Sequence, residues 1–195
     1  HPESHYYLLN KPLRVVSTCH APQGRKTVQT FLPPKVAHNQ GIHPVGRLDY
    51  NSTGALLLTN DGDLTYRLTH PRHHFPKTYR VVVAGQPSAA TLNRWRRGVR
   101  VGDRPAQPAR VTLVAPLSLH QTELEIILWE GQNRQIRRTA EQLGHPVKRL
   151  HRLAVGPIAL GDLAPGKIRT LTPPELLLLR QVSTQTSVPR NVTES

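Results

Sequence analysis

The chain has 195 residues, enough for one ordinary domain or two small ones that share an interface, and its 26 Lys and Arg against 12 Asp and Glu give a formal net charge of +14. This excess of positive charge indicates a polyanionic partner, with nucleic acid as the leading candidate, and the alternative is a basic surface without such a role. The chain contains no run of about 18 apolar residues, the length needed to span a bilayer. The single cysteine, Cys19, excludes an internal disulfide framework and favours a reducing compartment, so we expect a cytoplasmic protein.

The two ends of the chain differ in composition from its middle. There is no methionine, not even at position 1, so we expect that a further segment precedes the linker-like residues 1–4. Residues 182–195 are rich in Ser, Thr, Gln and Val without periodicity, which predicts a disordered tail. The folded part is therefore expected at 5–181, as two subdomains with a boundary near Gln86.

The expected strands are short runs of leucine, valine and isoleucine bounded by turn residues. Asn10-Lys11-Pro12 is expected to end the first of them. In chain order the strands are predicted at 6–9, 15–18, 55–59, 79–84, 110–114, 122–130 and 147–153.

The expected helices begin at polar capping residues and end at glycine or proline. Ser88 and Gly98 delimit one of them, and Asn133 and Gly144 another. The helical segments are predicted at 28–32, 63–68, 88–97, 133–143 and from 173 to about 181. Because strands and helices interleave, an α+β fold with a sheet, flanking helices and a cleft is expected.

One carboxylate stands alone in a long basic stretch. Asp49 is the first acidic residue after Glu3, and it follows Gly46-Arg47-Leu48. An isolated acid of this kind either forms a structural ion pair or works at the site of an anionic substrate. Alternation along an extended segment would place Arg47 and Asp49 on the same side.

The string of residues 43–62 that contains Asp49 resembles the catalytic motif of the RsuA/RluB/RluE/RluF family of ribosomal RNA pseudouridine synthases. Further blocks agree with this family in the same order, and the resemblance covers about residues 5–172. These blocks are residues 9–12 with 16–18, 77–79 and 130–138. The resemblance implies a mixed, mainly antiparallel sheet flanked by helices, with a central active-site cleft, and the isomerisation of uridine to pseudouridine in ribosomal RNA.

The resemblance also implies the roles of three catalytic residues. Asp49 would act on the ribose of the target uridine, either as a nucleophile at the anomeric carbon or as a base at the neighbouring carbon, and both routes stay open. Arg137 would be the guanidinium that favours the ionised carboxylate. Tyr79 would stack on the uracil and remove the proton from its carbon 5. A carboxylate can do this work without a cofactor or a metal.

The remaining expected site residues bind RNA. Arg47 would help to place the nucleotide after it has been flipped out of its stack, and Ile136 would pack against the flipped ring. On the helix predicted at 133–143, Ile136 belongs to the apolar face, Arg137 lies on its flank, and Arg134 and Arg138 point outward, as phosphate contacts or as solvated charges. Lys11 and Lys77 are expected phosphate contacts, and the Arg/Pro-rich stretch 94–110 is expected to contact RNA.

The chain departs from the family pattern in two respects. The family commonly has Lys-Pro-x-Gly where this chain has Lys11-Pro12-Leu13-Arg14, so a different loop conformation is expected there. Many members also carry a small N-terminal RNA-binding domain, which is expected to have preceded residue 1.

Two other readings of the sequence compete with an enzyme of this family. A metal site built from His70, His73 and His74 with Asp61 or Asp63 has unfavourable ligand spacing. A non-catalytic RNA-binding or ribosome-assembly protein would also be basic, but it has no need of a carboxylate among its phosphate-binding residues. We therefore expect a monomeric enzyme of ribosome biogenesis that acts on ribosomal RNA, alone or in a pre-ribosomal particle.

Overall fold

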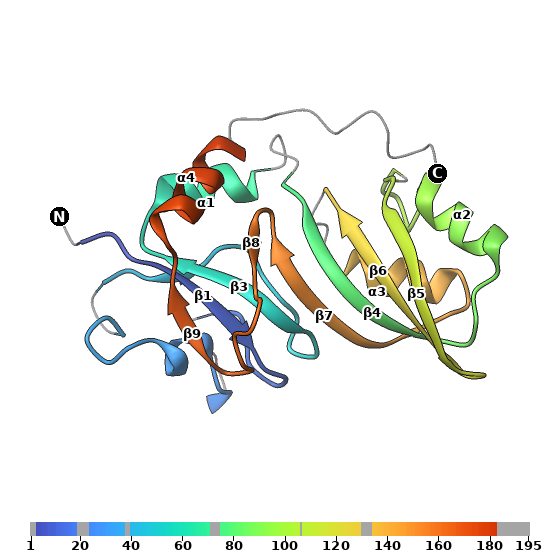
Figure 1. Cartoon of the computed structure of the whole chain (residues 1–195), viewed down its shortest axis with the longest axis horizontal. Helices are drawn as coiled ribbons and strands as arrows, with labels where there is room; N and C mark the ends of the chain where they lie inside the picture. The colour runs from blue at the N-terminus through green and yellow to red at the C-terminus, as the bar shows by residue number, and fades with distance from the viewer. Residues whose placement is uncertain are drawn as a thin grey trace. The chain divides into compact units, whose positions relative to one another are not determined.

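A computed structural model describes residues 3–18, 24–37, 40–70, 75–105, 107–129 and 134–182 (Figure 1). These residues form two compact units. Unit 2 is the middle of the chain, from Pro76 to His151, and unit 1 holds the described residues before and after it. The sequence placed the division near Gln86, but Gly85 and Gln86 connect a strand and a helix of the same core, so they lie inside unit 2.

Unit 1 is built on a sheet in which β3 and β1 are central. The order of its strands is β7-β3-β1-β9, with β2 paired to β3 and β8 to β7. The two central strands are antiparallel and pair from Tyr6 with Thr59 to Lys11 with Gly54. Its elements are β1 (Tyr6–Lys11), η2 (Val28–Phe31), β2 (His43–Pro44), β3 (Thr53–Thr59), α1 (Gly62–Thr69), the last residues of β7 (Val147–Val155), β8 (Ile158–Ala159), β9 (Ile168–Thr170) and α4 (Pro173–Val182).

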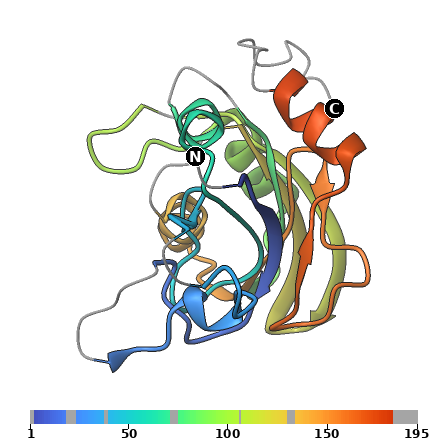
Figure 2. The same cartoon turned by 90° about the vertical axis from the view of Figure 1, so that its left-hand side faces the viewer.

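Both faces of the β1–β3 pair are covered, which explains the continuous apolar run of β3. Leu8 and Leu57 point into a core with residues of α1 and α4, whereas Leu9 and Leu56 point into a second core with Val28 of η2. Within unit 1, η2 lies on the other side of β1 from α4 (Figure 2). A strand buried on both faces cannot show the alternation of a half-buried one.

Gly54 allows β3 and β7 to approach each other closely. Its φ is 112°, and a Cβ at this position would overlap the backbone of Arg152 in β7. The Arg152 guanidinium is buried and donates from Nε to the carbonyl oxygen of Ala55 at 2.8 Å. A side chain at residue 54 would therefore separate the strand that follows the Asp49 loop from its neighbour.

Unit 2 is a sheet with the order β5-β6-β4-β7. The strand pairs β4–β6 and β5–β6 are antiparallel, and β5 is irregular near Leu113 and Pro116. In β6 alternate residues are buried, and the side chains of Leu124 and Ile126 pack with residues of both helices of the unit. Its elements are β4 (Lys77–Ala84), α2 (Ala89–Arg97), β5 (Arg110–Ser118), β6 (Gln121–Leu128), α3 (Gln135–Gln142) and the first residues of β7.

The structure confirms the α+β fold class and most of the expected elements. Residues 15–18 are an exception, because Val16 makes only a single bridge, with Thr27, and no strand forms there. The helix expected at 133–143 begins at Gln135, and its N-cap is Arg134 in a left-handed conformation (φ 58°). The expected cap Asn133 and the tail 183–195 lie outside the described residues. None of the described helices is long and apolar enough to cross a membrane.

Candidate active site

Asp49 lies in the loop between β2 and β3 of unit 1. Exposure alternates along this segment, since Arg47 is exposed, Leu48 is buried and Asp49 is half-buried. The loop is a tight turn in which the backbone N–H of Ser52 donates to the carbonyl oxygen of Asp49 at 2.9 Å. Ser52 is itself buried, which anchors the turn at the start of β3.

The segment after β1 fixes the backbone on both sides of Asp49. The Ser17 hydroxyl donates to the carbonyl oxygen of Leu48 at 2.6 Å and accepts from the N–H of Leu48 at 3.0 Å. On the other side, the N–H of Arg14 donates to the carbonyl oxygen of Tyr50 at 2.9 Å. Sequence reasoning missed Ser17 as a positioning residue, although it belongs to the block 16–18 that matched the family.

Arg14 occupies the position at which the family motif commonly has glycine. Its φ is 62°, the left-handed conformation that glycine adopts at little cost. Residue 14 thus has a backbone conformation suited to glycine, although arginine occupies the position.

Lys11 is not a phosphate contact, and that prediction is wrong. The side chain is 0% exposed, and its Nζ donates to the carbonyl oxygens of Pro12 at 3.0 Å and Val15 at 2.9 Å. Burial lowers the pKa of Lys11 to about 8, and the negative charge of Asp49 acts in the opposite direction. Lys11 is thus an internal cation that ties the end of β1 to the segment that holds the Asp49 loop.

Tyr79 lies on β4 in unit 2, where it pairs with Ile126. It is half-buried and packs against the core to which Ile136 belongs. Lys77, two residues earlier on the same side of the strand, is also half-buried. Tyr79 thus extends a row of core side chains and is itself only partly buried.

Helix α3 carries the other expected residues of unit 2. Arg137 is half-buried, and Arg134 and Arg138 are exposed, as the helical periodicity predicts. Ile136 is 4% exposed and belongs to the core of the unit. This burial argues against the expected packing of Ile136 on a flipped base, because nearly all of its surface is already covered.

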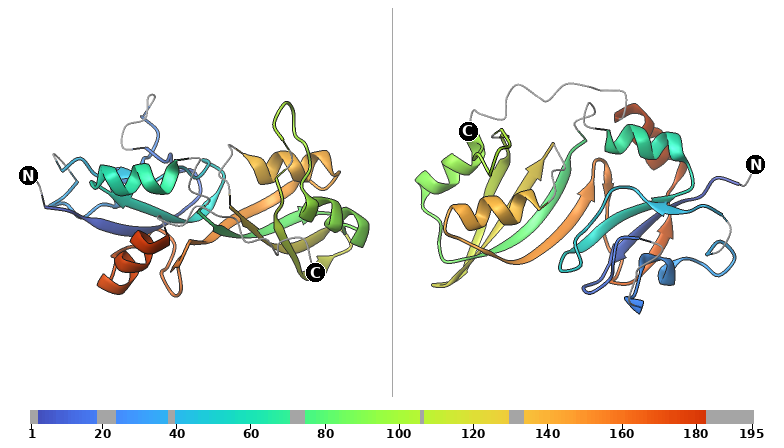
Figure 3. Two further views of the ribbon diagram at one scale, coloured as in Figure 1. Left: turned by 90° about the horizontal axis from the view of Figure 1, so that it is seen from above. Right: turned by 180° about the vertical axis from the view of Figure 1, so that it is seen from behind.

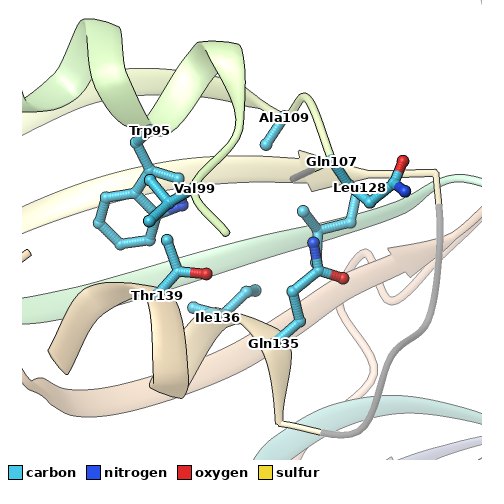
Figure 4. A pocket seen from close by; sticks show the side chains of 8 residues that line it. All are labelled: Trp95, Val99, Gln107, Ala109, Leu128, Gln135, Ile136 and Thr139. Atoms are coloured by element: carbon cyan, nitrogen blue, oxygen red, sulfur yellow. The ribbon is translucent and has the colours of Figure 1, made fainter. Parts of the chain in front are cut away.

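Ile136 borders a small cavity between α2 and α3 that has room for about one water molecule (Figure 4). The Oε1 atom of Gln135 is buried and has no hydrogen-bond partner within the described part of the chain. The cavity is far too small for a nucleobase. It is lined by Trp95, Val99, Gln107, Ala109, Leu128, Gln135, Ile136 and Thr139.

The metal site considered as an alternative, from His70, His73 and His74 with Asp61 or Asp63, can be compared with the residues that the structure describes. No group of three or more His, Cys, Asp or Glu side chains is placed there to hold an ion. His73, His74 and Cys19 lie outside the described residues, as do residues 130–133 of the last family block.

Comparison with known proteins identifies the family. Residues 5–142 match the family of RNA pseudouridylate synthases, so the chain belongs to this family. It is accordingly an RNA pseudouridine synthase, an isomerase whose substrate is RNA.

Relatives support this assignment over most of the chain. The chain is 38% identical over 179 residues to ribosomal large subunit pseudouridine synthase B of Bacillus subtilis, a match that spans 91% of this chain and 72% of the relative. It is 40% identical over 186 residues to an uncharacterized RNA pseudouridine synthase of Aquifex aeolicus (95% and 73%). It is also 40% identical over 179 residues to ribosomal large subunit pseudouridine synthase E of Xanthomonas campestris (83% and 92%).

Solved structures agree in fold. A crystal structure of a pseudouridylate synthase superposes with a TM-score of 0.80 at 30% identity, covering 92% of this chain and 75% of that one. Human RNA pseudouridylate synthase domain containing 1, at 13% identity, has a TM-score of 0.56 over 97% of this chain and 95% of its own, and it shows the shared fold alone.

Proposed function

We propose that this enzyme isomerises a specific uridine of ribosomal RNA, and that the RNA is that of the large subunit. The similarity to enzymes named for the large ribosomal subunit, at 37–40% identity over most of the chain, carries this proposal. We further propose that the protein acts as a monomer in the cytoplasm.

Asp49 is the proposed catalytic carboxylate. The reaction breaks the bond between N1 of uracil and the anomeric carbon, rotates the base and joins carbon 5 to that carbon. The proton of carbon 5 is then removed, and the freed N1 takes up a proton. No atoms are gained or lost overall, so no co-reactant is needed. The fixed turn around Asp49 supports this role, because either attack on the anomeric carbon or proton abstraction beside it requires a carboxylate held in one place.

Tyr79 and Arg137 are proposed to assist. Tyr79 is only half-buried; its ring can stack on uracil, and its phenol can accept the proton of carbon 5. Arg137 takes the guanidinium role of the family, in which the positive charge favours an ionised carboxylate.

The proposed RNA-binding residues are cations with accessible side chains. Arg47 is proposed to place the flipped nucleotide beside Asp49. Arg134, Arg138 and Lys77 are proposed phosphate contacts. Lys11 and Ile136 are not RNA contacts in this proposal, since both are buried in the fold.

The substitution Asp49→Asn tests the assignment. We expect that it abolishes tritium release from ribosomal RNA labelled at carbon 5 of uridine, while RNA affinity stays close to wild type. Asp162→Asn, which changes an exposed carboxylate of the same unit, is the matched control and should leave tritium release unchanged.

Two outcomes would contradict the proposal. Tritium release by Asp49→Asn at the wild-type rate would remove Asp49 from the chemistry. Pseudouridine maps of ribosomal RNA that are identical in cells with and without this gene would favour a non-catalytic RNA-binding protein instead.

A further inference from the structure

A hairpin, of which residues 98–105 and 107–110 are described, connects α2 to β5 and stands out from unit 2 beside α3 (Figure 3). Gly98 ends α2 with a φ of 100°, and a Cβ at this position would lie 2.8 Å from the backbone of Gln107 on the opposite arm. The N–H of Ala109 donates to the carbonyl oxygen of Arg96 at 3.1 Å, and Val101 bridges Arg104. The hairpin is therefore held to α2 at its base and closed towards its tip.

This hairpin is joined to α3 by a side chain. Nε2 of Gln142 donates to the carbonyl oxygen of Arg100 at 2.8 Å. Arg138 precedes Gln142 by four residues, so the two lie on one face of α3 about 6 Å apart along its axis, and Arg134 is the N-cap at the start of the helix. The exposed face of the helix thus leads from Arg134 through Arg138 to the hairpin.

The surface defined by this geometry is strongly basic. Arg100 and Arg104 are exposed on the hairpin and Arg134 and Arg138 on α3, and we call these four residues the arginine track. Within the described part of the chain, neither the Arg100 nor the Arg104 side chain makes a hydrogen bond or an ion pair. The acids close to the track in sequence are Asp103 and Glu141, so positive charge remains in excess.

The surroundings of the track favour a phosphate backbone over a protein partner. A protein interface has an apolar centre, but the large exposed apolar side chains of unit 2 lie on β5 and its following turn. They are Leu113, Val114, Leu117 and Leu119. A guanidinium group is suited to phosphate, which it can bind with two hydrogen bonds.

We propose that the hairpin residues Arg100 and Arg104 extend the phosphate-binding face of α3. They bind the backbone of the substrate RNA at nucleotides other than the target uridine. The proposal rests on the proposed function, since it concerns the same RNA. It assigns the hairpin a role in affinity and none in the chemical step, because backbone contacts carry no sequence information and touch no reacting atom.

The double substitution Arg100→Gln/Arg104→Gln tests this role. We expect RNA affinity at about 0.1 M salt to fall on the order of tenfold, and the slope of log affinity against log salt to decrease by about 1.4, about 0.7 for each lost contact with a single strand. KM should rise in proportion, while kcat at saturating RNA stays at the wild-type value. An unrelated RNA of the same length should lose affinity to the same extent.

Two control variants make the result decisive. Lys35→Gln/Arg67→Gln removes two exposed cations of unit 1 and should keep the wild-type slope. Arg100→Lys/Arg104→Lys should retain most of the slope, because lysine preserves the charge. Thermal unfolding of all variants shows whether the hairpin has remained folded.

The proposal is overturned if the glutamine variant keeps the wild-type slope and KM, if the unit 1 control loses as much affinity, or if only the cognate RNA is affected. A fall in kcat without a change in KM would also overturn it. A failure of the proposed function is distinguishable, because the wild-type enzyme would then release no tritium from ribosomal RNA whatever the slope.

Discussion

At the residue scale, the Asp49 loop is held in place by polar side chains that take no part in the proposed chemistry. Ser17 satisfies both backbone groups of Leu48, and Lys11 satisfies two carbonyl oxygens of the segment that carries Ser17. Buried polar groups are tolerated only when they are hydrogen-bonded in this way, so the segment after β1 has little freedom to move. A reactive carboxylate benefits from such a rigid support.

The buried ammonium of Lys11 predicts an unusual dependence of stability on pH. Its pKa is lowered from 10.5 in the unfolded chain to about 8 in the fold, so between these values the unfolded state binds a proton that the folded state has released. The free energy of unfolding therefore rises with pH in this window, and below pH 8 the contribution is constant. A neutral amine keeps two N–H groups, enough for both carbonyl oxygens.

The variant Lys11→Met isolates this effect. We expect the wild type to gain stability relative to Lys11→Met as the pH rises from about 8 to about 10, measured by urea unfolding. Tyr6 and Tyr7, whose pKa values are raised by burial, titrate in both proteins and cancel in the difference. A difference that stays flat across this range would show that Lys11 remains charged inside the fold.

At the scale of elements, local signals identified helices and central strands but not the way in which loops are held. Ser88 caps α2 through the N–H of Thr91, and Gly98 ends it, because capping depends on residues next to the helix. The strand expected at 15–18 does not form, since a strand requires a partner and Val16 finds one only in Thr27. The burial of Lys11 depends on segments distant in sequence, so only a three-dimensional structure could show it.

The candidate site divides in the same way between what sequence could and could not predict. The helical periodicity predicted for 133–143 correctly separated the exposed Arg134 and Arg138 from the buried Ile136. The link from α3 to the hairpin joins Gln142 to Arg100, which are far apart in the chain. No spacing rule relates two such residues.

The loop between β1 and Val15 offers a test of how an element stores strain. Arg14 has a φ of 62°, and this conformation costs a residue with a Cβ about 1–2 kcal/mol. We expect Arg14→Gly to raise the free energy of unfolding by about 0.5–1 kcal/mol, less than the full relief because glycine also gains freedom in the unfolded chain. Urea unfolding measures the change.

Arg14→Ala is the control for this substitution. It removes the guanidinium but keeps the Cβ, so it should not show the gain of the glycine variant. Equal stability of the two variants would mean that the left-handed backbone at residue 14 imposes no strain.

At the scale of the whole molecule, the net charge of +14 allows two readings that salt can separate. If RNA contacts are confined to the proposed cations, six side chains are involved: Arg47, Lys77, Arg100, Arg104, Arg134 and Arg138. Each contact with a single strand contributes about 0.7 to the slope of log affinity against log salt, so the slope should be about 4. Affinity should then fall by about 300-fold between 50 and 200 mM salt.

A generally basic surface predicts a different number. If the whole excess charge were neutralised by phosphate, the slope would approach about 10. Filter binding of the wild-type protein to a ribosomal RNA fragment across this salt range distinguishes the two, and single-turnover rates at saturating RNA should stay constant throughout. A slope of log affinity against log salt near 10 would show that the RNA is bound by charge spread over the whole surface. A slope near 4 requires that a few cations position the RNA while most of the others remain in water.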